Sequence, residues 1–87
     1  MDSRGQVLDA FCAVVNGLKR TGLRPEQLQT ELFLGGDLGI DSVEMLEVWY
    51  DLEQRLGIRI EDSEKRNIYT VDDALAVAER KLVALAA

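Results

Sequence analysis

Apolar residues along this chain recur every three or four positions in three separate stretches, which is the spacing of one face of an α-helix. The first stretch covers about residues 3–21, the second begins at Asp41 or Ser42 and ends near Leu56, and the third covers about residues 71–85. A shorter segment, 61–67, predicts one more helix. The pattern therefore predicts an all-α fold, a small bundle of three main helices plus one short helix.

Residues that favour helix ends support these limits. Gly22 and Gly57 are expected to stop the first and second helices, because glycine adopts the left-handed conformation at a helix C-terminus without strain. Asp41 is a favourable N-cap for the second helix, and Thr70 for the last. The face that the last helix should bury consists of Val71, Ala74, Leu75, Ala78, Leu82 and Leu85.

The connection between the first two helices, about residues 23–40, is longer than most loops in compact domains. It is also rich in apolar residues, namely Leu28, Leu32, Phe33, Leu34, Leu38 and Ile40. Because so many apolar side chains are costly to leave in water, we expect several of them to cover the core.

The second helix carries two apolar stripes when its residues are placed at about 100° intervals. One stripe is assigned to the core: Met45, Val48, Trp49, Leu52 and Leu56. The other lies on a different side, interleaved with polar residues: Val43, Leu46 and Tyr50, with Glu44, Glu47, Glu53 and Gln54. An apolar stripe edged with carboxylates is typical of a docking surface. Core packing against the long loop and a merely solvated acidic face are the competing interpretations.

Composition narrows the function. Eighty-seven residues are expected to form a single domain, 1–87. The absence of His removes any histidine base or Ser-His-Asp arrangement, and a single Cys excludes an internal disulfide and a Cys-rich metal site. A net charge of −6 disfavours binding to nucleic acid or to an anionic membrane.

The chain is expected in the cytoplasm, because no apolar run reaches the ~18 residues of a membrane span and the first residues do not resemble a signal peptide. Met1 suggests a free-standing protein, although a piece of a larger enzyme could also begin with Met.

Ser42 is the main candidate for chemistry, and three roles compete for it. Serine is favoured at the start of a helix, so a simple structural role is the plainest interpretation. A catalytic nucleophile is disfavoured, because there is no histidine partner and no Gly-x-Ser-x-Gly elbow. Covalent modification is the third role, since a phosphodiester at this position would lie near free backbone N–H groups and the positive end of the helix dipole.

A family resemblance favours the third role. The stretch Asp37-Leu38-Gly39-Ile40-Asp41-Ser42-Val43-Glu44 resembles the phosphopantetheine attachment motif of acyl carrier proteins, which usually reads Asp-Leu-Gly-x-Asp-Ser-Leu. The similarity continues through Glu47, Leu56-Gly57-Ile58, Ile60 and Thr70-Val71-Asp72-Asp73-Ala74, so it covers the chain from about Leu32 onward. Val43 replaces the usual Leu. The run Leu34-Gly35-Gly36 is similar to a peptidyl carrier motif, but no serine follows at that motif's spacing.

The resemblance implies that a phosphopantetheinyl transferase moves a 4'-phosphopantetheine arm from coenzyme A onto Ser42, and that the arm's thiol carries acyl groups as thioesters. Asp41 is expected beside the attachment chemistry, contacting the transferase or its metal. Such a protein is a carrier and not an enzyme, and we expect a monomer.

The same resemblance implies acyl-loading, ketosynthase or acyltransferase-type partners with basic docking patches, in fatty acid or polyketide-type biosynthesis. The acidic residues expected to meet those patches are Glu44, Glu47 and Glu53. The expected apolar contact consists of Val43, Leu46, Tyr50 and Ile58. A short acyl chain is expected to fold back between the second and third helices.

Four alternatives stay open or are rejected. An aminoacyl or peptidyl carrier is disfavoured by the acidic second helix and the motif spacing. A carrier-like fold used as a structural adaptor is disfavoured because Ser42 is present. Nothing in the sequence requires phosphorylation of Ser42. A calcium loop starting at Asp37 is rejected, because its twelfth position is Val48 where a bidentate Glu is required.

Overall fold

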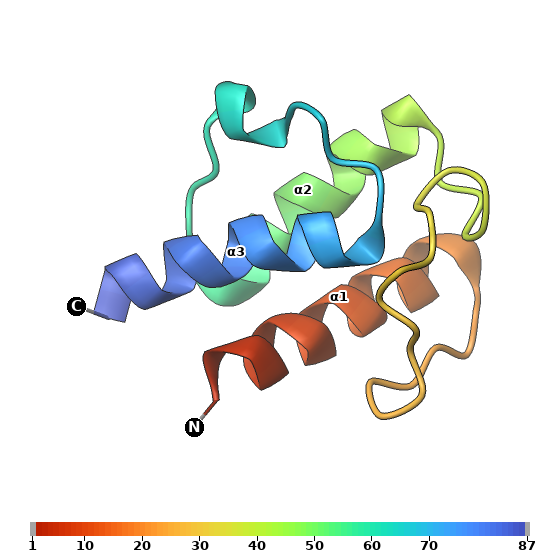
Figure 1. Cartoon of the computed structure of the whole chain (residues 1–87), viewed down its shortest axis with the longest axis horizontal. Helices are drawn as coiled ribbons and strands as arrows, with labels where there is room; N and C mark the ends of the chain where they lie inside the picture. The colour runs from red at the N-terminus through yellow and green to blue at the C-terminus, as the bar shows by residue number, and fades with distance from the viewer. Residues whose placement is uncertain (1, 87) are drawn as a thin grey trace.

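The computed structural model describes residues 2–86, which form three α-helices and one short 3-10 helix with no β-strand among them (Figure 1). Their bounds are α1 (Ser3–Lys19), α2 (Ser42–Leu56), η1 (Asp62–Lys65) and α3 (Val71–Ala86). The predicted all-α fold with three main helices and a short one is therefore confirmed. η1 is shorter than the predicted segment 61–67.

α1 contacts both other long helices. In Figure 1, α1 and α3 run in opposite directions along the front, α2 passes behind them, and both chain ends lie on the same side. The buried core contains Val7, Phe11, Val14, Val15, Val48, Trp49, Leu52, Val71, Ala74, Leu75, Val77 and Ala78 from the long helices. The buried members of the loops are Leu34, Ile40, Ile58 and Ile60. The predicted core stripe of α2 is thus confirmed, with Met45 and Leu56 partly buried against the same cluster.

The predicted glycine stop is confirmed at the end of α2 and is wrong at the end of α1. α2 ends at Gly57, which is left-handed (φ 65°) as predicted. α1 ends at Arg20, also left-handed (φ 56°), so the prediction that Gly22 stops this helix was wrong. The reason lies in Asn16, whose side chain accepts the Leu23 N–H (2.8 Å) and donates to the Leu23 carbonyl (2.9 Å), which holds the turn from Arg20 to Leu23 against the end of α1.

The long loop is packed, as predicted, and is fastened to the start of α3. Phe33 and Thr70 form an isolated antiparallel β-bridge, the Leu34 N–H donates to the Tyr69 carbonyl (2.8 Å), and the Val71 N–H donates to the Leu32 carbonyl (2.9 Å). These bonds place the segment before α2 against the segment before α3.

The far end of α3 departs from the predicted buried face. Leu85 is 63% exposed, because α3 runs past the ends of its neighbours, whereas Val77 is buried instead. Within residues 2–86, no helix is both long enough and apolar enough to cross a membrane.

Candidate functional site

Ser42 is the first residue of α2, and it is exposed. The turn that holds it is a reciprocal capping box: the Glu44 N–H donates to Asp41 Oδ1 (2.7 Å), and the Asp41 N–H donates to Glu44 Oε1 (3.1 Å). The prediction of Asp41 as N-cap is therefore confirmed. The box fixes the backbone on both sides of the serine while leaving its hydroxyl accessible.

The first turn of α2 also offers backbone donors. The N–H groups of Ser42 and Val43 lie where an α-helix supplies no acceptor for them. The partial positive charge of the helix end adds to this preference for an anion. A phosphate group attached to the Ser42 oxygen would lie beside these donors.

Lys19, at the end of α1, ties that helix to the start of α2. Its ammonium lies 3.1 Å from both Glu44 carboxylate oxygens, and only about a quarter of either side chain is exposed (26% and 25%). Glu44 therefore stabilises the cap, and its carboxylate is already paired within the chain. Its role on the docking surface stays a prediction.

The acidic start of the motif has a structural role. Asp37 Oδ2 accepts the Phe33 N–H (2.7 Å), the Gly39 N–H donates to the Gly35 carbonyl (3.0 Å), and the Ile40 N–H donates to the Leu34 carbonyl (3.0 Å). Gly39 is left-handed (φ 70°), a conformation that side chains disfavour. These contacts fold residues 33–40 into a compact turn that leads directly into Asp41.

A cavity of about 640 Å³ opens beside the serine. Its wall is mostly apolar and comes from the loop, from α2, from the end of η1 and from the segment before α3. The lining residues are Phe33, Leu34, Gly35, Gly36, Ile40, Asp41, Ser42, Met45, Leu46, Trp49, Lys65, Ile68 and Tyr69. The cavity therefore lies between α2, the loop before it and the connection from η1 into α3, and it reaches Ser42.

The second stripe of α2 faces solvent. Val43, Leu46 and Tyr50 are 68%, 66% and 62% exposed, and Glu47 on the same helix is also exposed. Burial of this stripe under the long loop, which was the competing interpretation, does not occur, although Leu46 also lines the cavity beside that loop. Three apolar side chains exposed along one helix form a surface that a partner could cover.

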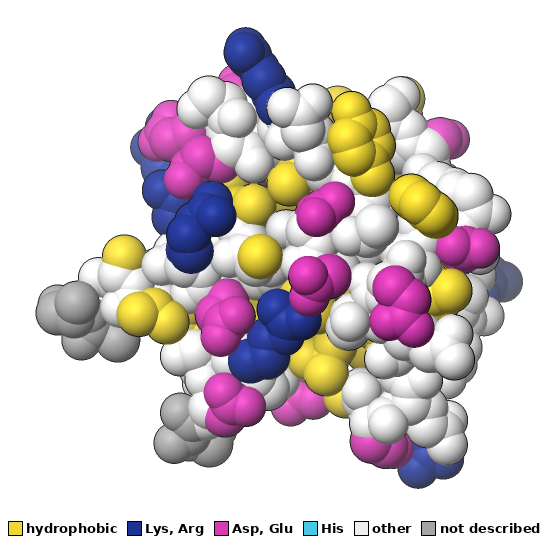
Figure 2. All heavy atoms as spheres, viewed as in Figure 1, with side chains coloured by type: hydrophobic (Ala, Val, Ile, Leu, Met, Phe, Trp, Pro, Cys, Tyr) yellow, Lys and Arg dark blue, Asp and Glu magenta, His cyan; other side chains and the backbone are white. Residues whose placement is uncertain are grey.

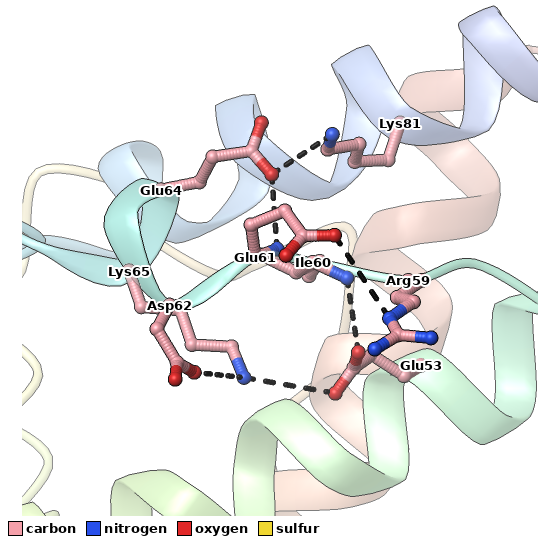
Figure 3. A network of polar contacts seen from close by, with 8 residues as sticks. All are labelled: Glu53, Arg59, Ile60, Glu61, Asp62, Glu64, Lys65 and Lys81. Carbon is pink, nitrogen blue, oxygen red and sulfur yellow. Dashed lines mark hydrogen bonds and ion pairs between the residues drawn. The ribbon is translucent and has the colours of Figure 1, made fainter.

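Two residues predicted on that surface lie elsewhere. Ile58 is only 9% exposed and belongs to the core, because the left-handed turn at Gly57 directs the chain back over α2. Glu53 accepts the Ile60 N–H through Oε2 (2.9 Å), and its Oε1 lies 3.8 Å from the Lys65 ammonium (Figure 3). Its carboxylate therefore holds the segment after α2. The docking roles of Ile58 and Glu53 stay predictions, and neither side chain lies on the exposed stripe.

The same polar network holds η1 on α3. In Figure 3, the Lys81 ammonium from α3 points at Glu64, with a distance of 2.8 Å to Oε2, which also accepts the Glu61 N–H (3.0 Å). The hydrogen bond from Lys81, followed by that from the Glu61 backbone, lowers the pKa of Glu64 below its usual value. The ion pair between Lys81 and Glu64 thereby holds η1, whose last residue Lys65 lines the cavity, against α3.

Cys12 has no role in this site. It is 3% exposed in α1, and burial raises the pKa of its thiol, which reduces its reactivity. Within residues 2–86, no group of three or more His, Cys, Asp and Glu side chains is arranged to hold a metal ion.

Sequence reasoning missed Lys19, Lys65, Phe33 and Tyr69. Phe33 and Tyr69 are both exposed and lie some 36 residues apart in the sequence, so no periodic pattern connects them. Lys19 lies in the last turn of α1, where the helix dipole already favours a positive charge, so its position alone does not point to the site. Its contact with Glu44 depends on how the long loop returns the chain.

Comparison with known proteins gives similarity along most of the chain. It is 36% identical over 76 residues to the acyl carrier protein of Renibacterium salmoninarum, covering 87% of this chain and 91% of that protein. It is 35% identical over 75 residues to the acyl carrier protein of Myxococcus xanthus (86% of this chain and 92% of that protein). The same identity and length hold for the protein of that name from Micrococcus luteus, with 86% and 90% covered. A scan against protein-family models finds no match.

Proposed function

The chain belongs to the acyl carrier protein family, and from this premise we propose that it holds acyl groups as thioesters on a 4'-phosphopantetheine arm attached to Ser42. The observation that carries the proposal is the placement of Ser42, exposed at the first residue of a capped helix with a cavity opening beside it. Family members shuttle such groups between enzymes of fatty acid or polyketide-type biosynthesis.

The residues present fit the phosphopantetheine group. The Ser42 hydroxyl is accessible for the phosphodiester, and the N–H groups of Ser42 and Val43 lie in the first turn, where an anion is favoured. When bound, the group would supply a terminal thiol that forms thioesters. Asp41 would remain the N-cap and present its second carboxylate oxygen next to the serine, where a transferase or its metal could contact it.

We assign partner docking to the exposed stripe of α2. Val43, Leu46 and Tyr50 would supply the apolar contact, and Glu47 the negative charge for a basic patch. An acidic chain of net charge −6 would be steered toward such partners, which include the phosphopantetheinyl transferase and acyl-loading, ketosynthase or acyltransferase-type enzymes. A small surface of this kind favours the weak and rapid binding that a carrier needs.

The cavity beside Ser42 is the proposed shelter for a short acyl chain. It is mostly apolar, it is formed largely by α2, the loop before it, the end of η1 and the segment after η1, and Ser42 itself lines it. A thioester-bound chain folded into it would remove apolar surface from water. The carrier would function as a single domain and a monomer.

The test is the intact mass before and after incubation with coenzyme A and a promiscuous phosphopantetheinyl transferase. Wild type should gain one phosphopantetheine and Ser42→Ala should gain none. Ser63→Ala is the matched control, because Ser63 is also an exposed serine in a short helical segment, and it should gain the group as wild type does. No gain by a folded wild-type protein would overturn the proposal and favour the adaptor role.

A further inference from the structure

The wall of the cavity beside Ser42 is unusually aromatic. The chain has five aromatic residues, and three of them, Phe33, Trp49 and Tyr69, line this one cavity. Since apolar lining alone would serve a plain alkyl chain, the concentration of rings calls for a more specific explanation.

Two of these rings form an exposed rim. Phe33 is 55% exposed and Tyr69 is 61% exposed, although both are large apolar side chains whose burial would be favourable. Figure 2 shows hydrophobic side chains standing out at the upper right of this face, where Figure 1 places the loop before α2 and the connection into α3. A ligand that covered the rim would remove this surface from water.

The rim is held in place before any ligand arrives. Phe33 forms the β-bridge to Thr70, and the Leu34 N–H donates to the Tyr69 carbonyl at 2.8 Å. The Tyr69 N–H in turn donates to Asp73 Oδ2 (3.0 Å) at the start of α3. Because both backbones are fastened to each other and to a helix, little ordering of the backbone is required when a ligand binds between the rings.

The inner wall of the cavity combines an aromatic ring with a polarizable thioether. Trp49 is 3% exposed, so its ring is fixed by the core, and it lies seven residues after Ser42 on α2, which is about 10 Å along the helix axis. Met45, one turn nearer to Ser42, has a polarizable thioether that contacts aromatic rings favourably. A bulky fixed ring two turns from the attachment point suits a compact cargo better than a long one.

We propose that this cavity selects short acyl groups that contain an aromatic ring. The inference rests on the proposed function, since the cargo must be attached at Ser42. An aromatic acyl ring could pack edge-to-face or offset against Phe33, Tyr69 and Trp49, and ring pairs gain an attraction beyond the area that they bury. A saturated ring of the same size would bury similar area and lack this gain.

The test compares two cargoes of matched shape, benzoyl and cyclohexanecarbonyl, each loaded onto Ser42 from its coenzyme A thioester by the promiscuous transferase. Hydroxylamine then cleaves each thioester, releasing the acyl group as a hydroxamate and leaving the thiol. Each rate is divided by the rate for the same acyl group on free pantetheine, which removes the difference in intrinsic reactivity. The benzoyl thioester should be protected about two- to tenfold more than the cyclohexanecarbonyl thioester.

Three variants refine the test. Phe33→Leu and Tyr69→Leu should reduce the extra protection of the benzoyl group, whereas Val83→Ala should leave it intact, because Val83 is a half-exposed apolar residue of α3 that lines neither this cavity nor the docking stripe of α2. Equal protection of both cargoes in wild type, or protection of neither, would overturn the aromatic preference. Loading is read separately as a mass gain on Ser42, so failure of the preference is distinguishable from failure of the carrier function.

Discussion

The Lys19 ammonium lies 3.1 Å from both carboxylate oxygens of Glu44, and this contact joins the last turn of α1 to the first turn of α2. Glu44 also accepts the N–H of Asp41, so the ion pair and the helix cap share one carboxylate. Lys19→Met should therefore lower the free energy of unfolding by about 1 kcal/mol, at the upper end for ion pairs that remain partly in solvent. Urea unfolding measures this loss.

A matched control is available in Arg24, which pairs with Glu26 at 3.0 Å with both side chains largely exposed. Arg24→Met should cost no more than about 0.3 kcal/mol, because exposed local pairs contribute little. Equal losses in the two variants would contradict a special role for Lys19 at the start of α2.

Asp41 combines two roles that substitution can separate. Asp41→Ala removes the side chain that accepts the Glu44 N–H and should cost about 1 kcal/mol of stability. Asp41→Asn keeps an oxygen acceptor, and Asn caps helices as well as Asp does, so it should leave the stability close to wild type. It should nevertheless lower kcat/KM for phosphopantetheine transfer by about tenfold or more, since the charged contact to the transferase or its metal is lost.

The informative outcome is the comparison of the two properties in Asp41→Asn. An unchanged transfer rate in this variant would show that Asp41 acts only as the cap. A circular dichroism spectrum like that of wild type ensures that the rate is measured on folded protein.

The limits of α2 could be predicted from sequence because each depends on one residue and its immediate neighbours. Asp41 caps its own helix, and Gly57 adopts the left-handed turn that other residues disfavour. Arg20 could not be predicted as the end of α1 by the same rules, because the decisive contacts come from the Asn16 side chain to Leu23. Glycine preference was a weaker factor there than a specific hydrogen-bonded turn.

Those parts of the site that depend on neighbouring residues of one helix could also be predicted. The Asp41 cap places Ser42 at the start of α2, and helical periodicity separates Val43, Leu46 and Tyr50 from the core stripe. Periodicity does not show that Glu53, inside α2, bonds to the chain after the helix, or that Ile58, beyond the helix, turns into the core. The aromatic rim joins Phe33 and Tyr69 through a β-bridge between two loops, and that pairing has no signature in either segment.

Asp73 should make the free energy of unfolding depend on pH in the acidic range. Its Oδ2 accepts the N–H groups of Tyr69 (3.0 Å) and Thr70 (3.1 Å), and these bonds lower its pKa below the ordinary 3.8. A carboxyl with a lowered folded-state pKa stabilises the protein above the unfolded-state value, and the contribution is lost as the pH falls through the folded-state value. Asp73→Asn should therefore be less stable than wild type at neutral pH, by about 0.5–1 kcal/mol, and the difference should shrink below about pH 4.

Urea unfolding of both proteins from neutral pH to about pH 3 measures this convergence. Thr70→Val is the control: it removes the neutral acceptor of the Asp73 N–H (3.1 Å), and the Thr70 side chain is the smallest cause of the lowered Asp73 pKa, so its loss of stability should depend less on pH. A constant gap between Asp73→Asn and wild type over the whole range would contradict the assignment to Asp73.

The exposed stripe of α2 should matter for partners and not for folding. Leu46 is 66% exposed, so Leu46→Ala should change the free energy of unfolding by less than about 0.5 kcal/mol. The same change should raise the KM of the phosphopantetheinyl transferase by about five- to thirtyfold if Leu46 lies at the centre of the contact. Val83→Ala on α3 is the control, because Val83 is also a half-exposed apolar residue and lies outside the stripe. A rise in KM for both variants would contradict a localised docking surface.

Ile58 should show the opposite behaviour. It is 9% exposed and packs in the core, so Ile58→Ala should lower the free energy of unfolding by about 2–4 kcal/mol through lost burial and the cavity left behind. Measured on the folded fraction, its KM for the transferase should equal that of wild type, because no partner can reach the side chain. Val43→Ala, on the exposed stripe, should give the reverse pattern of near-normal stability and weakened docking. A stable Ile58→Ala protein with a raised KM would return Ile58 to the docking surface and would mean that the turn at Gly57 opens when a partner binds.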